Sequence, residues 1–332
     1  MDSGQPDFRN EQLNRIGRMI YRKLGKTDMD VSIIGFGASP LGDVFDPTDE
    51  TEGIKSVHCA IDLGINYFDV APFYGDTLAE TRLGKALKGK RDKVFLSTKC
   101  CRYGKYSFDF SYERVINSIN ESLDRLQTDY VDVYQVHDIE FGAREQVLNE
   151  AIPAALKVKE SGKARYVGIT GLPVRYMASI ARLTDVDTLL SWAHYNLLED
   201  EVNDELVPLS QEKGFGLINA SPLLQRLLSD LPVPPWHRSP QPVKDIKPRL
   251  LDLCLKYKVD LSDVAIRYAI DHPGIATTLV GMSESKYVEK NIEVLDFEIP
   301  DGLLQQIKEM VEPVKNQMWF EGRSENNIPK NI

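Results

Sequence analysis

The chain has 332 residues with a formal net charge of −10, and 42% of its residues are hydrophobic. The acidic balance disfavours nucleic acid as a partner, because phosphate backbones are bound by basic surfaces. The polar start, MDSGQPDFRNEQLNR, lacks the apolar core of a signal peptide, and no run of about 18 apolar residues predicts a membrane span. We therefore expect a cytoplasmic protein that folds as a single domain over 1–332, with its core at about 21–313.

Apolar β-like runs alternate along the chain with stretches of helical period. A segment over 19–25 predicts a strand of a capping hairpin, and eight further runs predict strands at 31–37, 66–71, 94–100, 130–137, 165–170, 188–196, 215–221 and 277–282. The stretch over 111–127 has apolar residues three to four apart, as in an amphipathic helix. Repeated strand–helix units of this number predict the α/β class and a (β/α)₈ TIM barrel. An open doubly wound sheet is disfavoured, because GFGASPLG lacks the third glycine of a G-x-G-x-x-G turn.

Two segments do not follow this alternation of strands and helices. The stretch over 225–245 is too rich in proline for a helix and predicts a long loop after the seventh strand. It is either a disordered connection or a lid that folds Trp236 and His237 over the barrel mouth. From residue 300 onward we expect a helix over 302–314 and then a polar tail, whose Trp319 and Phe320 either dock near the mouth or cover the surface.

Four ionisable residues stand at or just after the ends of successive predicted strands: Asp69, Tyr74, Lys99 and His137. The carboxyl ends of parallel barrel strands meet at one rim, so we expect these side chains to lie within reach of one another. Taken singly, each has an ordinary structural explanation, such as a helix cap, a loop anchor, a solvated strand end or a satisfied buried histidine. Their joint position favours a catalytic site.

This combination predicts acid and base chemistry at an alcohol or carbonyl oxygen. A tyrosine hydroxyl ionises near pH 10, so Tyr74 needs a nearby cation to relay protons at neutral pH. We expect Lys99 to supply that charge and to lower the pKa of Tyr74. Asp69 would hold the lysine through a charge-assisted hydrogen bond, and His137 would orient the reacting oxygen. The set contains no electron carrier, so hydride transfer requires a bound cofactor.

Several longer segments resemble the aldo-keto reductase family, over roughly residues 21–291. They include YRKLGKTDMDVSIIGFG, GINYFDVAPFYG, SLDRLQTDYVDVYQVH, GKARYVGIT and GMSESKYVEKN. The resemblance implies a barrel that binds a nicotinamide cofactor across its carboxyl rim. It places the family's catalytic tetrad on Asp69, Tyr74, Lys99 and His137, with the tyrosine as general acid and base.

The same resemblance implies a set of cofactor contacts. They fall on Gly37, Ala38, Asp69, Thr170, Gly171, Trp192, Ser221, Leu223, Gly281, Met282, Ser283, Glu284, Tyr287 and Asn291. Thr170 and Gly171 depart from the Ser-Asn pair that usually grips the nicotinamide carboxamide, and Trp192 replaces a usual glutamine. Ala220 stands where many members stack an aromatic ring on the nicotinamide. We therefore expect the contacts to the nicotinamide ring to differ in detail from those of other family members.

The segment GMSESKYVEKN also bears on the choice of cofactor. Family members that prefer NADP carry Lys or Arg there, where this chain has Met282 and Tyr287, to pair with the 2′-phosphate. Glu284 lies between them, and a carboxylate repels a phosphate while accepting hydrogen bonds from ribose hydroxyls. We therefore predict NAD, with Lys286 as the one opposing charge.

The substrate is expected from a more detailed resemblance, carried by RKLGKTDMDVSIIGFGASPLGDVF, WAHYNLLED and VEPVKNQMWFEGRSENN. These segments resemble plant members of the family that oxidise C1 of L-galactose to the 1,4-lactone on the way to ascorbate. Polar and aromatic groups near the mouth suit a sugar, which needs hydroxyl partners and an aromatic face. The candidate substrate contacts are Tyr74, His137, Phe73, Trp192, His194, Asn196 and Arg226.

Two other functions stay open at this stage. An NADPH-dependent aldehyde reductase is the commoner activity in the family, and a nucleotide-binding, redox-sensing regulatory subunit is a non-enzymatic use of the barrel. The intact catalytic tetrad argues against the regulatory subunit. The five histidines form no spaced ligand pair, so we expect no metal site. The sequence leaves open the oligomeric state and the discrimination between L-galactose and L-fucose.

Overall fold

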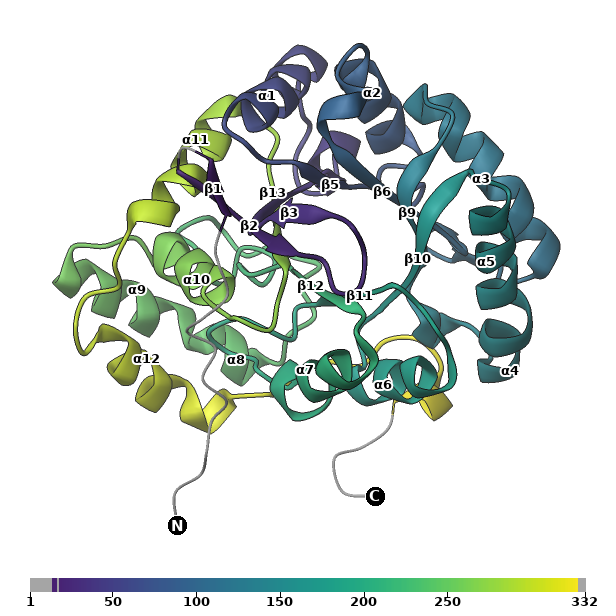
Figure 1. The fold of residues 1–332 in the computed structure, drawn as a ribbon. Helices are drawn as coiled ribbons and strands as arrows, with labels where there is room; N and C mark the ends of the chain where they lie inside the picture. Colours follow the sequence, from purple (N-terminus) through teal and green to yellow (C-terminus); the bar gives the residue numbers. More distant parts are fainter. Residues whose placement is uncertain (1–13, 17, 328–332) are drawn as a thin grey trace.

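The computed structural model describes residues 14–16 and 18–327. Eight parallel strands close into a barrel in the order β10-β11-β12-β13-β4-β5-β6-β9, and helices surround it (Figure 1). In chain order the barrel strands are β4 (Ile34–Gly37), β5 (Tyr67–Asp69), β6 (Phe95–Cys100), β9 (Val131–Val136), β10 (Ala164–Gly171), β11 (Thr188–Trp192), β12 (Gly216–Ala220) and β13 (Thr277–Gly281). The predicted (β/α)₈ barrel is confirmed.

The predicted run at 31–37 holds two strands instead of one. β3 (Asp30–Ser32) pairs antiparallel with β2 (Met19–Lys23), which also pairs with β1 (Asn14–Ile16), and the barrel strand β4 begins only at Ile34. The β2–β3 hairpin crosses the barrel opening in Figure 1. Its apolar residues Leu24 and Met29 are fully buried against a cluster that includes side chains of several barrel strands. The predicted hairpin therefore caps the amino end of the barrel.

Helices follow the strands and cover the barrel from outside. They are α1 (Glu50–Asp62), α2 (Leu78–Leu87), α3 (Tyr112–Leu126), α4 (Arg144–Gln146), α5 (Ile152–Glu160), α6 (Val174–Leu183), α7 (Val202–Lys213), α8 (Gln241–Asp245), α9 (Lys247–Tyr257), α10 (Leu261–Ile270), α11 (Ser285–Glu293) and α12 (Leu303–Val311). α3 matches the predicted amphipathic helix and buries Val115, Ile119 and Leu126. A short antiparallel hairpin, β7 (Arg102–Gly104) and β8 (Ser107–Phe108), follows β6 and was not predicted.

The proline-rich segment is a packed loop that ends in a short helix. The prediction of a loop over the whole of 225–245 is wrong for α8, which has Pro242 in its first turn, where the missing N–H breaks no helical hydrogen bond. Leu227 and Leu228 are fully buried, so the segment packs on the body of the protein. Trp236 is 47% exposed and its ring lies 5.7 Å from that of Phe45.

The C-terminal segment runs from α12 back along the molecule towards α6 (Figure 1). Trp319 is buried, with its ring 5.7 Å from Trp192 and 5.9 Å from His237. The neighbouring Phe320 is 74% exposed and does not share this docking. The polar N-terminal residues 1–13 and the last tail residues, 328–332, lie outside the described part of the chain.

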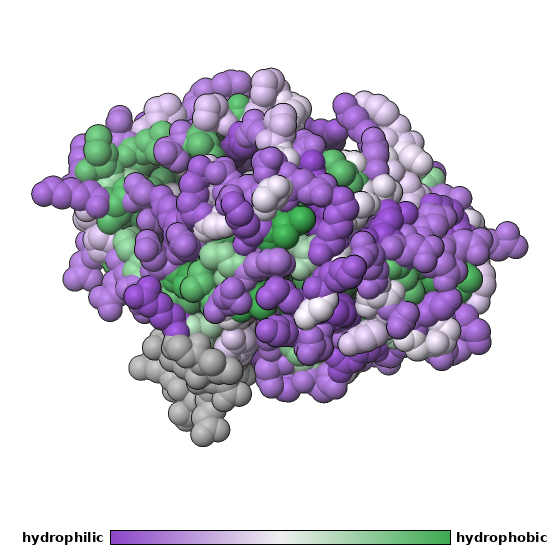
Figure 2. All heavy atoms as spheres, turned by 90° about the horizontal axis from the view of Figure 1, so that it is seen from above, coloured by the Kyte–Doolittle hydropathy of each residue, from purple (hydrophilic) through white to green (hydrophobic). Residues whose placement is uncertain are grey.

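Hydrophilic residues cover most of the face shown in Figure 2, and apolar residues appear between them in separate groups. Among the described residues, none of the helices has both the length and the apolar character needed to cross a membrane.

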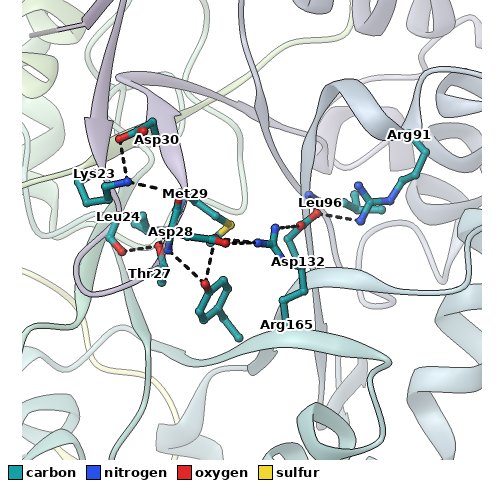
Figure 3. Close-up of polar contacts among 11 residues, drawn as sticks. Lys23, Leu24, Thr27, Asp28, Met29, Asp30, Arg91, Leu96, Asp132 and Arg165 are labelled. Atoms are coloured by element: carbon teal, nitrogen blue, oxygen red, sulfur yellow. Dashed lines mark hydrogen bonds and ion pairs between the residues drawn. The ribbon is translucent and has the colours of Figure 1, made fainter.

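An alternating network of charges ties the capping hairpin to the amino ends of β9 and β10 (Figure 3). Asp132, which is 2% exposed, accepts hydrogen bonds from Arg91 at 2.8 Å, from Arg165 at 2.7 Å and from the backbone of Leu96 at 2.8 Å. Arg165 reaches on to both carboxylate oxygens of Asp28 in the hairpin turn, at 2.7 Å each. The cap is thus held by apolar burial and by this chain of charges.

Replacing Asp132 by Asn should destabilise the fold, because it leaves two arginines beside a buried group that no longer carries charge. Breaking a buried ion pair from one side costs about 3 kcal/mol. The midpoint of urea unfolding measures this loss. Glu121→Gln, which loses only a partly exposed pair with Arg114, is the control and should cost less than about 1 kcal/mol. Equal midpoints for the wild type and Asp132→Asn would contradict the assignment.

Candidate active site

The centre of the site is a buried ion pair between Lys99 on β6 and Asp69 at the end of β5. Their side chains are 1% and 3% exposed. Lys99 Nζ also donates to the carbonyl oxygen of Val70 at 2.9 Å, and the other oxygen of Asp69 accepts from Gln135 Nε2 at 2.9 Å. Burial opposes the charge on Lys99, but Asp69 and Tyr74 outweigh it and raise the pKa of the lysine. Lys99 is therefore a fixed cation.

Tyr74 lies in the turn after β5, where its hydroxyl is 3.3 Å from Lys99 Nζ. Burial raises the pKa of Tyr74 above the ordinary value of 10.0, and Lys99 offsets only part of this effect. The expectation of a lowered pKa is wrong for the protein alone, because desolvation of the phenolate outweighs the attraction of the ammonium group. The contact between the two groups still defines a path for a proton.

His137 follows β9 and faces the tyrosine. The centroids of the two rings are 6.0 Å apart and their planes are nearly perpendicular. Burial lowers the pKa of His137 to about 3, so the imidazole is neutral at physiological pH. Its Nδ1 has no hydrogen-bond partner among the residues that the structure describes. A neutral imidazole can orient a substrate oxygen without adding a positive charge.

A second buried ion pair lies beside this tetrad and was missed by the sequence analysis. The Asp138 carboxylate pairs with Arg102, and its Oδ2 is 3.5 Å from His137 Nε2. The backbone N–H of Asp138 donates to Thr170 Oγ1 at 3.0 Å. The only sequence signal was its position directly after the histidine. Regular strand alternation would have placed it on the opposite face, but a left-handed backbone, with φ of 46°, changes its direction.

Glu140 explains why residue 171 is glycine. Its side chain is fully buried, one oxygen accepts from the backbone of Leu172 at 3.1 Å, and a Cβ at Gly171 would lie 2.7 Å from the other oxygen. Burial raises the pKa of Glu140 well above its usual range, with Asp138 adding to the effect. The tail is fastened to the backbone of the same residue, because the Arg323 N–H and the Asn326 side chain both donate to its carbonyl oxygen at 2.9 Å.

The ends of β4, β12 and β13 form a sector of the rim that suits a nicotinamide cofactor. Small residues stand at these ends, followed by hydroxyl and apolar groups that are mostly partly exposed: Gly37, Ala38, Ala220, Ser221, Leu223, Gly281 and Ser283. A Cβ on Gly37 would press on Val280 O at 3.1 Å, so the backbones of β4 and β13 approach each other closely here. The hydroxyls of Ser221 and Ser283 are donors and acceptors that a nicotinamide cofactor could use, and Thr170 is the second-last residue of β10.

The beginning of α11 carries the other expected cofactor residues. Met282 is fully buried, Asn291 is 9% exposed and Tyr287 is 36% exposed. Glu284, just before the helix, pairs with Lys286 at 2.7 Å. The N–H and the hydroxyl of Ser285 both donate to Glu52 Oε1 of α1, at 3.2 and 3.0 Å. A carboxylate from another helix therefore occupies the N-terminus of α11, a contact that the sequence did not reveal.

The structure separates the expected substrate contacts into two groups. Phe73 is partly buried, with its ring 6.1 Å from that of His137, and Trp192 ends β11 and contacts Trp319. Each of the other three has a polar neighbour within the protein.

His194 is buried 3.3 Å from Glu201, and Arg226 is paired with Asp46. Asn196 uses both ends of its amide within its own loop, donating to Ala193 O at 2.8 Å and accepting from the backbone of Leu198 at 2.9 Å. The contacts among the aromatic rings therefore favour Tyr74, His137, Phe73 and Trp192 as the centre of the substrate site, and His194, Asn196 and Arg226 stay predictions.

Comparison with known proteins agrees with this geometry. The model of the aldo/keto reductase family matches residues 33–312. The chain belongs to the aldo/keto reductase family. L-galactose dehydrogenase of Arabidopsis thaliana is 42% identical over 315 residues, covering 92% of this chain and 98% of that protein. D-threo-aldose 1-dehydrogenase of a Pseudomonas species is 28% identical over 308 residues, covering 84% and 94%.

Among solved structures, the holo form of an aldo-keto reductase from Bacillus halodurans superposes with a TM-score of 0.76. The two sequences are 28% identical, and the match covers 93% of this chain and all of that one. This aldo/keto reductase is therefore an oxidoreductase of a family that uses nicotinamide cofactors.

The raised pKa of Tyr74 predicts a pH dependence for alcohol oxidation. Oxidation needs the deprotonated tyrosine, and a raised pKa leaves little of it ionised at pH 7, so kcat/KM should increase with pH well into the alkaline range. Initial rates between pH 7 and pH 10, with chemistry shown to limit the rate, measure this. Tyr74→Phe should lose about 10²-fold or more in rate and the pH-dependent rise with it. A flat profile would exclude Tyr74 as the base.

Proposed function

We propose that this protein oxidises L-galactose at C1 to L-galactono-1,4-lactone with NAD, in the cytoplasm and as part of ascorbate biosynthesis. The observation that carries the proposal is the Asp69–Lys99–Tyr74 chain beside a neutral His137, in a sequence 42% identical to an L-galactose dehydrogenase. A second relative also bears the name of a sugar 1-dehydrogenase, which supports oxidation at an anomeric carbon.

In the proposed reaction the C1 hydroxyl of the sugar hydrogen-bonds to Tyr74 and His137. Tyr74 removes the hydroxyl proton as C1 loses its hydride, and Lys99 stabilises the ionised tyrosine. Asp69 keeps the lysine charged and aimed, and His137 orients the sugar oxygen without competing for the proton. The nicotinamide, when bound, supplies the hydride acceptor. Thr170, Ser221 and the small residues of the β4, β12 and β13 sector would hold it.

Preference for NAD is supported by the charges around the start of α11. Glu52 binds the first N–H of the helix, and Glu284 lies directly before it. In the segment 281–291, Lys286 pairs with Glu284 and Lys290 pairs with Asp260. Lys55 lies 3.5 Å from Glu52 on α1. Helix N-termini favour anions, but here a carboxylate already occupies that position, so a 2′-phosphate would meet negative charge.

The first experiment measures the initial rate of nicotinamide reduction by the purified protein with L-galactose, using NAD and NADP in parallel. D-galactose and L-fucose are the comparison substrates. Fast turnover with NAD and L-galactose is the expected result. Absence of turnover with any sugar, together with reduction of aldehydes by NADPH, would replace this proposal with an aldehyde reductase. Slow turnover with tightly retained nucleotide would favour a redox sensor.

Glu52→Gln tests the basis of the cofactor preference. Removing this charge should raise kcat/KM with NADP relative to NAD by about tenfold, because the N-terminus of α11 then faces the cofactor without a competing carboxylate. Steady-state kinetics with both cofactors measures the ratio. Glu50→Gln is the matched control, since Glu50 lies on the same helix but pairs with Lys85. An unchanged ratio in Glu52→Gln would remove Glu52 from the explanation.

A further inference from the structure

The Arg102–Asp138 ion pair is mostly buried and packs against aromatic rings, unlike an ion pair on the surface. Asp138 is 2% exposed and the Arg102 side chain 11%. The guanidinium carbon of Arg102 lies 3.8 Å from the centroid of the Phe73 ring, with Phe108 and Phe141 at 5.3 and 5.2 Å. Three aromatic rings therefore fix the plane of a guanidinium group whose Nε has no hydrogen-bond partner among the described residues.

This pair lies against His137, the residue that would orient the substrate oxygen. Asp138 Oδ2 is 3.5 Å from His137 Nε2. The left-handed backbone at Asp138 turns its side chain to the same side as that of the histidine. Non-glycine residues adopt this conformation at a cost, and such strain is concentrated at functional positions. Burial works against ionisation of Asp138, but His137, Arg102 and Lys99 lower its pKa, so it is a carboxylate.

We propose that Asp138, held by Arg102, accepts a hydrogen bond from the hydroxyl on the carbon next to the reacting carbon, which is the C2 hydroxyl of an aldose oxidised at C1. This inference rests on the proposed function. A sugar whose C1 oxygen bonds to Tyr74 and His137 would bring the hydroxyl of its neighbouring carbon towards the groups that contact His137, and the Asp138 carboxylate is one of these.

The chemistry of the pair selects the C2 hydroxyl over the other neighbour of C1. The ring oxygen of a cyclic sugar has lone pairs only, so a carboxylate would repel it. A hydroxyl donates to the carboxylate and can accept from the guanidinium group, so it satisfies both members of the pair. Asp138 is thus a residue for substrate recognition, and Arg102 positions it.

The wild-type protein tests this inference without any mutation. Its kcat/KM should be about 10- to 100-fold lower for 2-deoxy-L-galactose than for L-galactose, the expected loss for a hydrogen bond to a charged group. Loss of the electron-withdrawing C2 hydroxyl eases hydride departure from C1, so chemistry alone would change the rate in the opposite direction. L-fucose, which keeps the C2 hydroxyl and lacks the one at C6, is the control substrate and should stay close to L-galactose.

Asp138→Asn then assigns the loss to this residue. The variant should lose about 10- to 100-fold in kcat/KM with L-galactose but only slightly with 2-deoxy-L-galactose, because that sugar never made the contact. Asp187→Asn also removes a buried, ion-paired carboxylate, far from the tetrad at the amino end of β11, and should leave the ratio of the two sugars unchanged. If Asp138→Asn lowers kcat/KM equally for both sugars, the residue has a structural role and the inference is overturned.

The two proposals fail in different ways. If the wild type oxidises no sugar, the proposed function fails and this inference fails with it. If the wild type oxidises L-galactose and 2-deoxy-L-galactose equally well, only the assignment of Asp138 to the C2 hydroxyl is overturned. If Asp138→Asn does not fold, the wild-type comparison of L-galactose, L-fucose and 2-deoxy-L-galactose decides alone.

Discussion

The buried ion pair between Lys99 and Asp69 is the interaction on which the rest of the site depends. Removing an ammonium and a carboxylate group from water costs several kcal/mol for each ion, so such a pair persists only when the remaining polar atoms are satisfied. Here Val70 and Gln135 provide those partners. Because Lys99 is held from three directions, the hydroxyl of Tyr74 has a charge fixed beside it before any substrate arrives, which is electrostatic preorganisation.

The two ends of the barrel use charge differently. At the amino end, Asp132 and Asp28 alternate with arginines, and each charge faces a partner of opposite sign. At the carboxyl end, polar atoms such as His137 Nδ1 and Arg102 Nε lack protein partners within the described chain. Paired charges can stabilise a fold, whereas a buried polar atom without a hydrogen-bond partner costs stability and is kept where a ligand can use it. The charges that fasten the cap and the groups that would carry out the chemistry therefore lie at opposite ends of the barrel strands.

Much of the fold could be predicted from the sequence, because apolar runs and helical periods report local structure directly. The positions of Asp69, Lys99 and His137 at strand ends were visible for the same reason. The boundary at Ile33 was not, because one apolar run continues from the hairpin into the barrel and only the pairing of the strands divides it. Asp138 was missed because its direction depends on one backbone angle. The use of the Asn196 amide inside its own loop was also not visible in the sequence.

The tail contacts have a consequence for how the protein matures. Trp319, Arg323 and Asn326 reach the mouth from the last part of the chain, while the last barrel strand ends at Gly281. During synthesis the barrel strands leave the ribosome before these residues do, and domains can begin to fold while synthesis continues. The scaffold can thus form before the wall around Trp192 and Glu140 is complete. The newly made chain would pass through a stage in which it is already a barrel but does not yet have its final selectivity.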